Sequence, residues 1–215
     1  ALYITDYASA RTRKLLTNLV DLLAAIPSLL YGIWGFLYLG EYIVPLSQFL
    51  TDHFGWIPIF ATDEDATFTG SMFIAGIVVS LMVLPIIASV SREVFAQTPP
   101  AEKEAALALG GTRWVMVRNV VLPFGKGGII GGSMLGLGRA LGETIAVALM
   151  LSATYTINWH ITEPGGITFA SNIALKWNEA GDIGISALIA SGLVLFVITL
   201  GVNMAARLII ARRSE

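Results

Sequence analysis

The sequence of 215 residues has no cysteine, only two histidines and few charged side chains. Without cysteine, a disulfide framework and thiolate metal sites are excluded. His53 and His160 are too few for a histidine-built metal centre. Only 13% of the residues are charged and 55% are hydrophobic, whereas soluble domains carry about 25% charged residues. This shortage of charge predicts an all-α polytopic membrane protein, because a segment that crosses lipid must satisfy its own backbone hydrogen bonds.

Four segments are apolar and long enough to cross a membrane, which takes about 20 residues. They are residues 18–40, 69–90, 127–151 and 184–209. The opening Ala1-Leu2-Tyr3-Ile4 resembles the last turn of an earlier apolar segment, so we expect the natural protein to extend further toward its N-terminus.

Basic residues gather on one side of these segments. All but two of the 13 lysines and arginines lie before the first segment, between the second and third segments, or at and after the end of the fourth. If the segments cross the membrane in turn, these three stretches lie on the same side. By the positive-inside rule, the loop 91–126 and the tail 210–215 are predicted to be cytoplasmic. The loops 41–68 and 152–183 are predicted to be external.

The loop 91–126 has its own helical pattern. A run of strong helix formers extends from Glu102 to Leu109, and Gly110-Gly111 is expected to end that helix. A second short helix is predicted over residues 112–119. Together they would form a helix-turn-helix that projects into the cytoplasm.

Within this loop, Glu104-Ala105-Ala106, a glycine at 110 and Val120-Val121-Leu122-Pro123 resemble the signature of the permease subunits of ABC importers. Valine stands where isoleucine is usual. The resemblance implies a type I, MetI-like transmembrane domain over residues 1–215, with 91–126 as the coupling-helix loop that docks on an ATP-binding subunit. The implied coupling residues are Glu104, Ala105, Ala106, Gly110, Leu122 and Pro123.

The sequence has no Gly-x-x-x-x-Gly-Lys-Ser/Thr motif, which in ATPases cradles the phosphates of ATP. We therefore expect a transport subunit that is not an enzyme and that binds no cofactor itself. A separate ATP-binding subunit would use ATP and Mg.

Two ionisable residues lie inside the third apolar segment. Arg139 follows Lys126 by thirteen residues, which is about 20 Å along a helix and predicts a position near the middle of the membrane. Glu143 would then lie one turn further on the same face. Charges at that depth cost about 2.5–3.5 kcal/mol each and need a partner or a wet path.

Two interpretations of Arg139 and Glu143 remain open from the residues alone. In the first, the two side chains form a structural ion pair. In the second, Arg139 faces a translocation path and binds an anion, and Glu143 orients it or contacts a neighbouring subunit. The planar guanidinium suits an oxyanion because it can donate two parallel hydrogen bonds.

Two periodic patterns predict packing. Glycines repeat every four residues in the third segment, which favours close approach to the fourth span or to another subunit. A stripe of apolar residues predicts a short amphipathic helix within 167–180. The residues are Gly128, Gly132 and Gly136, and Phe169, Ile173 and Trp177.

Residues 138–147 resemble the corresponding span of the permeases of bacterial phosphate importers, the Pst family, and the PstC-type subunit more than its PstA-type partner. Residues 25–35 and 171–180 resemble other parts of the same subunit. The resemblance covers nearly the whole chain, although the usual six spans are not all present. It implies a permease for inorganic phosphate, with Arg139 and Glu143 on the path of the anion.

The resemblance also implies partners. They are a PstA-like second permease, two PstB-like ATP-binding subunits and an extracytoplasmic PstS-like phosphate-binding protein, besides membrane lipid; nucleic acid is not expected. An alternative cargo is another oxyanion, such as sulfate or molybdate. An intramembrane enzyme or a passive channel is disfavoured, because the spans carry no His, no Cys and no paired acids.

Overall fold

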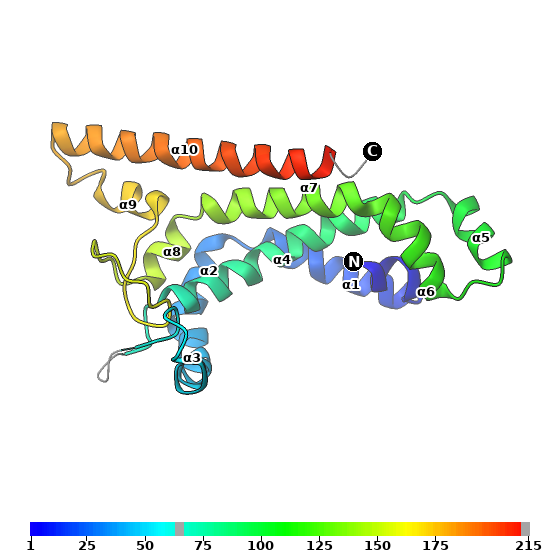
Figure 1. The fold of residues 1–215 in the computed structure, drawn as a ribbon, viewed down its shortest axis with the longest axis horizontal. Coiled ribbons are helices and arrows are strands. Elements are labelled where there is room, and N and C mark those ends of the chain that lie inside the picture. Colours follow the sequence, from blue (N-terminus) through cyan, green and yellow to red (C-terminus); the bar gives the residue numbers. More distant parts are fainter. Residues whose placement is uncertain (63–66, 212–215) are drawn as a thin grey trace. The chain divides into compact units, whose positions relative to one another are not determined.

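The structure, a computed structural model, describes residues 1–62 and 67–211, which form helices joined by irregular connections (Figure 1). In chain order these are η1 (Tyr3–Tyr7), α1 (Ala10–Ala25), α2 (Ser28–Trp34), η2 (Gly35–Leu39), α3 (Gly40–Phe54), α4 (Met72–Ala96), α5 (Pro100–Ala108), α6 (Arg113–Met116), η3 (Val117–Val121), α7 (Leu122–Leu141), α8 (Ile145–Met150), α9 (Phe169–Lys176) and α10 (Asp182–Ala211), where η marks a π-helical turn. The all-α prediction is confirmed. Residues 63–66 of the predicted external loop 41–68 and 212–215 of the predicted tail lie outside the described residues, and α10 includes residues 210 and 211.

The chain divides into two compact units. The first comprises residues 1–25, 83–139 and 201–215, and the second comprises residues 26–82 and 140–200. Helices α4 and α10 each contribute one part to each unit. The loop with the signature residues 104–106 therefore belongs to the first unit, together with the N-terminal helices.

Within the described residues, four helical stretches are long and apolar enough to cross a membrane. They are Ser28–Phe54, Met72–Ala96, Arg113–Leu141 and Asp182–Leu208. The predicted number of spans is confirmed. The second and fourth stretches overlap the predicted spans 69–90 and 184–209.

The first span begins later than predicted. Residues 18–40 were expected to cross, but α1 ends at Ala25 and a new helix begins at Ser28. Pro27 explains the break, because proline lacks a backbone N–H and disfavours the helical conformation of the residue before it. The helix then continues to Phe54, so residues 41–54 belong to the candidate span and not to the predicted external loop 41–68.

The third span begins earlier and ends earlier than the predicted 127–151. A continuous helical stretch runs from Arg113 to Leu141. The chain then leaves the helix at residues 142–144 and begins the short helix α8 at Ile145. Gly142 favours this break, because a glycine inside a helix is destabilising by roughly 0.5–1 kcal/mol relative to alanine.

Much of the predicted loop 91–126 is continuous with the long helices on either side of it. Helix α4 continues through Ala96, and the next long helical stretch begins at Arg113. The predicted second short helix, residues 112–119, is thus the start of the third span. Only residues 97–112 form a projecting connection, with α5 in the middle of it.

The first unit has a small buried core beside this connection. Phe95, Met116, Val117 and Val121 are buried together, and Ala1 and Leu2 pack against them. Helix α7 lies along the second half of α4 (Figure 1).

The contact between α7 and α4 runs through the glycines that repeat every four residues. A Cβ on Gly128 would lie 2.3 Å from Val94 Cγ2, and one on Gly136 would lie 2.5 Å from Val83 Cγ1. The glycine stripe therefore packs on the second span. The prediction that it packs on the fourth span or on another subunit is wrong.

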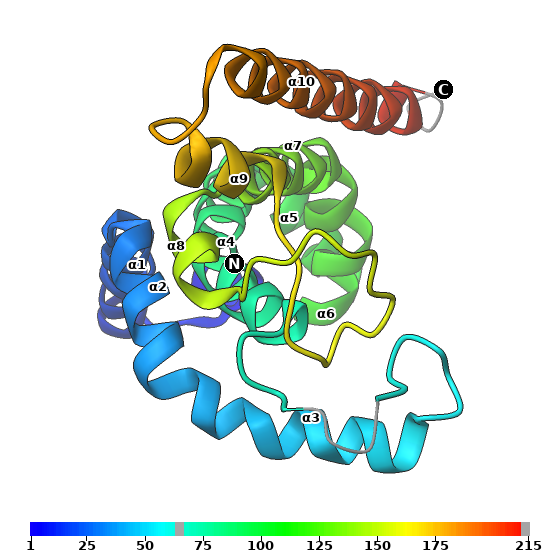
Figure 2. The same cartoon turned by 90° about the vertical axis from the view of Figure 1, so that its left-hand side faces the viewer.

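The second unit is built around α2 and α8, which lie side by side (Figure 2). A Cβ on Gly32 of α2 would lie 2.6 Å from Ala146 Cα of α8, so only glycine permits this approach. Helix α9 begins with a capping box between Thr168 and Ser171, and it confirms the short helix predicted within 167–180.

Candidate functional site

Helix α5 carries the Glu-Ala-Ala triplet. It begins at Pro100, where proline is compatible with a helix start because its missing N–H would have no intrahelical partner. It ends before Gly110, whose φ of +83° lies in the left-handed region that favours glycine. The predicted helix and its glycine stop are both confirmed.

The two faces of α5 differ. Lys103 and Ala106 are the only residues of α5 that are not exposed, and they lie three residues apart on one face. Ala106 packs against the buried core of Phe95, Met116, Val117 and Val121. Glu104 and Ala105 point away from the unit and are exposed.

An exposed surface therefore surrounds the triplet. Leu107 is 41% exposed, Leu109 is 90% exposed and Trp114 is 57% exposed. Leu107 and Leu109 lie on the projecting connection outside the candidate spans, and Trp114 lies in the first turn of the third candidate span. Large exposed apolar side chains at such a tip are typical of a protein interaction surface. The predicted coupling residues separate into an outward set, Glu104 and Ala105, and an inward set, Ala106 and Leu122, which both pack against the buried core.

Pro123 lies inside the third span, not at the end of a loop. The π-helical turn η3 precedes it and ends at Val121. Proline cannot donate the usual backbone hydrogen bond and its ring clashes with the carbonyl four residues earlier. The wider turn just before Pro123 relieves that clash, so the helix continues to Leu141.

Arg139 lies in the last turn of α7, and its side chain is exposed. Among the described residues of its own unit, no carboxylate oxygen lies within 4.0 Å of its guanidinium. A cation in the last turn of a helix interacts favourably with the helix dipole. Five donors of a fixed, charged fork thus remain available to a ligand.

Glu143 lies beyond the end of α7, in the connection to α8. The prediction that it shares a helical face with Arg139 is wrong, because the helix ends at Leu141. The residue is 7% exposed, and Oε1 of its carboxylate accepts a hydrogen bond of 3.3 Å from the backbone N–H of Ala146. Glu143 therefore satisfies one of the N–H groups that a helix leaves unpaired in its first turn.

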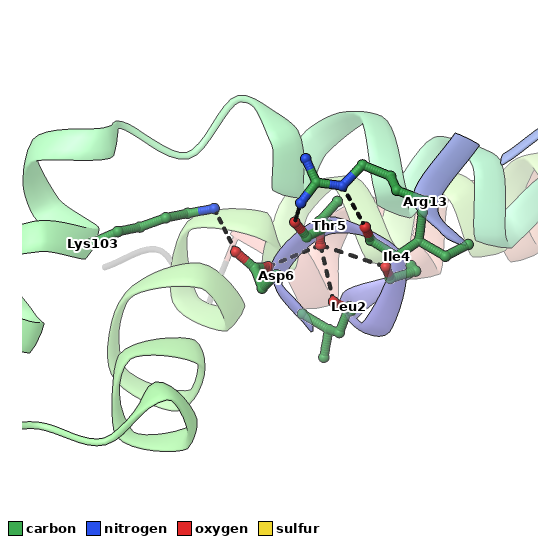
Figure 3. A network of polar contacts seen from close by, with 7 residues as sticks. Leu2, Ile4, Thr5, Asp6, Arg13 and Lys103 are labelled. Carbon is green, nitrogen blue, oxygen red and sulfur yellow. Dashed lines mark hydrogen bonds and ion pairs between the residues drawn. The ribbon is translucent and has the colours of Figure 1, made fainter. Parts of the chain in front are cut away.

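A polar network that the sequence did not reveal joins α5 to the N-terminal helices (Figure 3). Lys103 Nζ lies 2.8 Å from Asp6 Oδ1, across 97 residues of sequence. Thr5 Oγ1 donates to the other carboxylate oxygen, Asp6 Oδ2, at 2.8 Å. The sequence hints at this contact only through Lys103, which lies three residues before Ala106 and therefore on the same face of the predicted helix.

The N-terminal helices carry two further polar contacts. Arg13 of α1 donates from Nε to the carbonyl of Ile4 at 3.0 Å and from Nη2 to the carbonyl of Thr5 at 2.8 Å. Asp21, also on α1, lies 3.2 Å from Arg92 Nη2 of α4. The contact between Asp21 and Arg92 spans 71 residues of sequence, which is why local patterns do not predict it.

Comparison with known proteins gives consistent matches. The family model described as "binding-protein-dependent transport system inner membrane component" matches residues 2–215. The chain is similar to the phosphate transport system permease protein PstC 2 of Mycobacterium tuberculosis, with 47% identity over 212 residues, which are 97% of this chain and 65% of that protein. It is 41% identical to the phosphate transport system permease protein PstC of Xylella fastidiosa over 220 residues, 100% of this chain and 67% of that protein.

A third relative is the phosphate transport system permease protein PstC of Haemophilus influenzae, with 38% identity over 217 residues, 100% of this chain and 69% of that protein. The chain spans 65% of the length of the mycobacterial relative. The name that these relatives share describes those longer proteins.

Proposed function

We propose that this chain, which belongs to the family of binding-protein-dependent transport system inner membrane components, is the membrane-spanning permease subunit of an ATP-driven phosphate importer. The names of its relatives support phosphate as the cargo. The observation that carries the proposal is Arg139, an exposed guanidinium in the last turn of a candidate span with no carboxylate within 4.0 Å among the described residues of its unit. A phosphate oxyanion matches that fork with paired, charge-assisted hydrogen bonds.

The proposed transporter needs other subunits. The outward face of α5 supports docking on an ATP-binding subunit, since Glu104, Ala105 and Leu109 are all exposed there. That partner would bind and hydrolyse ATP with Mg, and this chain would bind neither. We infer a complex with a second, homologous permease, two ATP-binding subunits and an extracytoplasmic phosphate-binding protein.

The proposal also assigns a side of the membrane to each end of the spans. The distribution of basic residues supports a multi-pass arrangement in the bacterial plasma membrane. The connection 97–112 and the tail 210–215 would face the cytoplasm, and the segments 55–68 and 152–181 would face the outside. Helix α5 would then lie where ATP is available.

The mechanism follows from these assignments. When the two ATP-binding subunits bind ATP, they close on each other. This closure moves α5, which contacts one of them. Movement of α5 changes the arrangement of the helices and exposes the path to the opposite side. Phosphate that the binding protein delivers meets Arg139 and passes inward, while Glu143 holds the start of α8 through Ala146.

The test uses the full-length protein in its complete complex, reconstituted in vesicles with ATP inside and loaded binding protein outside. Arg139→Gln is expected to lower phosphate uptake by about tenfold or more, because charge-assisted hydrogen bonds of about 1.5–3 kcal/mol are lost. Arg207→Gln, which removes an exposed arginine from α10, is the matched control.

Two results would overturn the proposal. An Arg139→Gln complex that assembles and imports phosphate at the full rate would remove Arg139 from the path. Uptake that an excess of sulfate or molybdate inhibits more strongly than an excess of unlabelled phosphate would identify another oxyanion as the cargo.

A further inference from the structure

We propose that Asp6 and Lys103 form a positioning link that passes the movement of α5 to η1 and α1. The inference rests on the proposed transport function, because it concerns how the ATP-driven movement of α5 reaches the rest of the first unit. It assigns a role to two residues that lie outside the signature triplet and outside the span that carries Arg139.

The inner face of α5 has few contacts with the unit. Of its nine residues, only Lys103 and Ala106 are not exposed. Ala106 contributes a single methyl group to the buried core. Lys103 reaches further, to Asp6 on η1 at 2.8 Å. The ion pair therefore connects α5 directly to a charged group of the N-terminal helices.

The carboxylate of Asp6 is held on both oxygens. Oδ1 pairs with Lys103, and Oδ2 accepts from Thr5 Oγ1 (Figure 3). The Asp6 side chain is only 6% exposed and that of Lys103 is 21% exposed. Separating such a pair leaves a buried charge without a partner, which is strongly unfavourable. A displacement of α5 thus moves Asp6 with it.

Asp6 in turn belongs to a segment fastened to α1. The two hydrogen bonds from Arg13 to the carbonyls of Ile4 and Thr5 tie η1 to the first turn of α1. At the other end of α1, Asp21 accepts hydrogen bonds of 3.2 Å from Arg92 and from Ser89 of α4. A series of polar contacts therefore leads from α5 through η1 and α1 to the second span.

Apolar packing joins Ala1 and Leu2 to the same core as Ala106, but it does not fill the space beside the polar contacts. A cavity of about 450 Å³ lies among η1, α1, α4 and α5, and its lining includes Thr5, Arg13, Arg92 and Lys103. Where side chains do not fill the space between helices, dispersion contacts across it are lost. The ion pairs at the edge of the cavity thus carry the mechanical connection.

The experiment uses the complete complex described above and measures the phosphate imported per ATP hydrolysed. Lys103→Met is expected to lower this ratio by about fivefold or more, the lower range of coupling between sites. Lys103→Arg keeps the charge and is expected to keep the ratio. Lys176→Met is the matched control, because it breaks a Lys–Glu pair of similar length, 2.9 Å, that is exposed and far from α5 in the sequence.

Assembly is measured in parallel by purification of the complex through the ATP-binding subunit. If Lys103→Met does not assemble, Asp6→Asn decides, because asparagine retains an acceptor for Thr5 and removes only the charge. A lowered ratio in an assembled Asp6→Asn complex supports the link. An unchanged ratio in any assembled Lys103→Met or Asp6→Asn complex overturns it.

The two proposals fail separately. If the wild-type complex imports a different solute and no phosphate, the cargo is wrong. The ratio of that solute to ATP then tests the link between Asp6 and Lys103 on its own.

Discussion

At the scale of single residues, glycine decides how closely α7 approaches α4. Gly128 and Gly136 face valine side chains of α4, whereas Gly127 has nothing within 4 Å of the position where a Cβ would lie. Two neighbouring glycines of the same helix therefore have different roles. Gly128 permits close packing of the two helices, whereas Gly127 only lowers the helix propensity of the exposed face.

This difference gives a prediction for Gly128→Ala. The added methyl would lie 2.3 Å from Val94 Cγ2, and overpacking of this kind typically costs about 1–3 kcal/mol. We expect a lower thermal unfolding temperature of the purified protein in detergent. Gly127→Ala is the control and is expected to be neutral or to stabilise by up to about 1 kcal/mol, the difference in helix propensity. Equal unfolding temperatures for the two variants would contradict this account of the stripe.

At the scale of elements, the break between α7 and α8 separates the roles of Arg139 and Glu143. Arg139 lies in the last turn of one helix and Glu143 lies before the first turn of the next. Glu143 has a local structural task, since it accepts from the N–H of Ala146. Burial of an ionised carboxylate is costly unless the group is paired and hydrogen-bonded.

Two substitutions separate the structural task of Glu143 from its charge. Glu143→Ala removes the acceptor and is expected to lower stability by about 1 kcal/mol. Glu143→Gln retains an acceptor oxygen, so its thermal unfolding should match the wild type. We expect its phosphate uptake to fall by roughly tenfold, which corresponds to about 1.4 kcal/mol in the rate-limiting barrier. Full uptake by Glu143→Gln would show that only the acceptor is needed.

At the scale of the whole molecule, the assignment of sides can be tested directly. These 215 residues contain no cysteine, so single cysteines report on single positions once any cysteine elsewhere in the full-length protein is replaced. Trp159 is 75% exposed and lies in a segment proposed to face outward. Ser9 is exposed and lies close to Arg11, Arg13 and Lys14, which the positive-inside rule assigns to the cytoplasmic side.

In intact cells, a membrane-impermeant maleimide is expected to label Trp159→Cys and not Ser9→Cys. After the cells are opened, both variants should be labelled. The physical reason is that the basic residues near Ser9 stay on the cytoplasmic side. Labelling of Ser9→Cys in intact cells would reverse the proposed orientation.

The sequence alone determined that the chain is helical and membrane-embedded, because 13% charged residues and four long apolar runs leave few other solutions. It also located the helix of the Glu-Ala-Ala triplet and its glycine stop, since helix propensity and the left-handed glycine are local properties. The limits of the first and third spans were less predictable. The apolar composition of the sequence continues across Pro27 and Gly142. The helical backbone hydrogen bonds, in contrast, are interrupted near both residues.

Only the tertiary structure decided which residues meet. It placed the glycine stripe of α7 on α4, because the close approach depends on the opposing valines. It removed Glu143 from the helical face of Arg139, because the helix ends at Leu141. It also brought Lys103 to Asp6 across 97 residues. Such contacts depend on how the helices pack, and an ion pair between segments far apart in the chain leaves no periodic pattern in either of them.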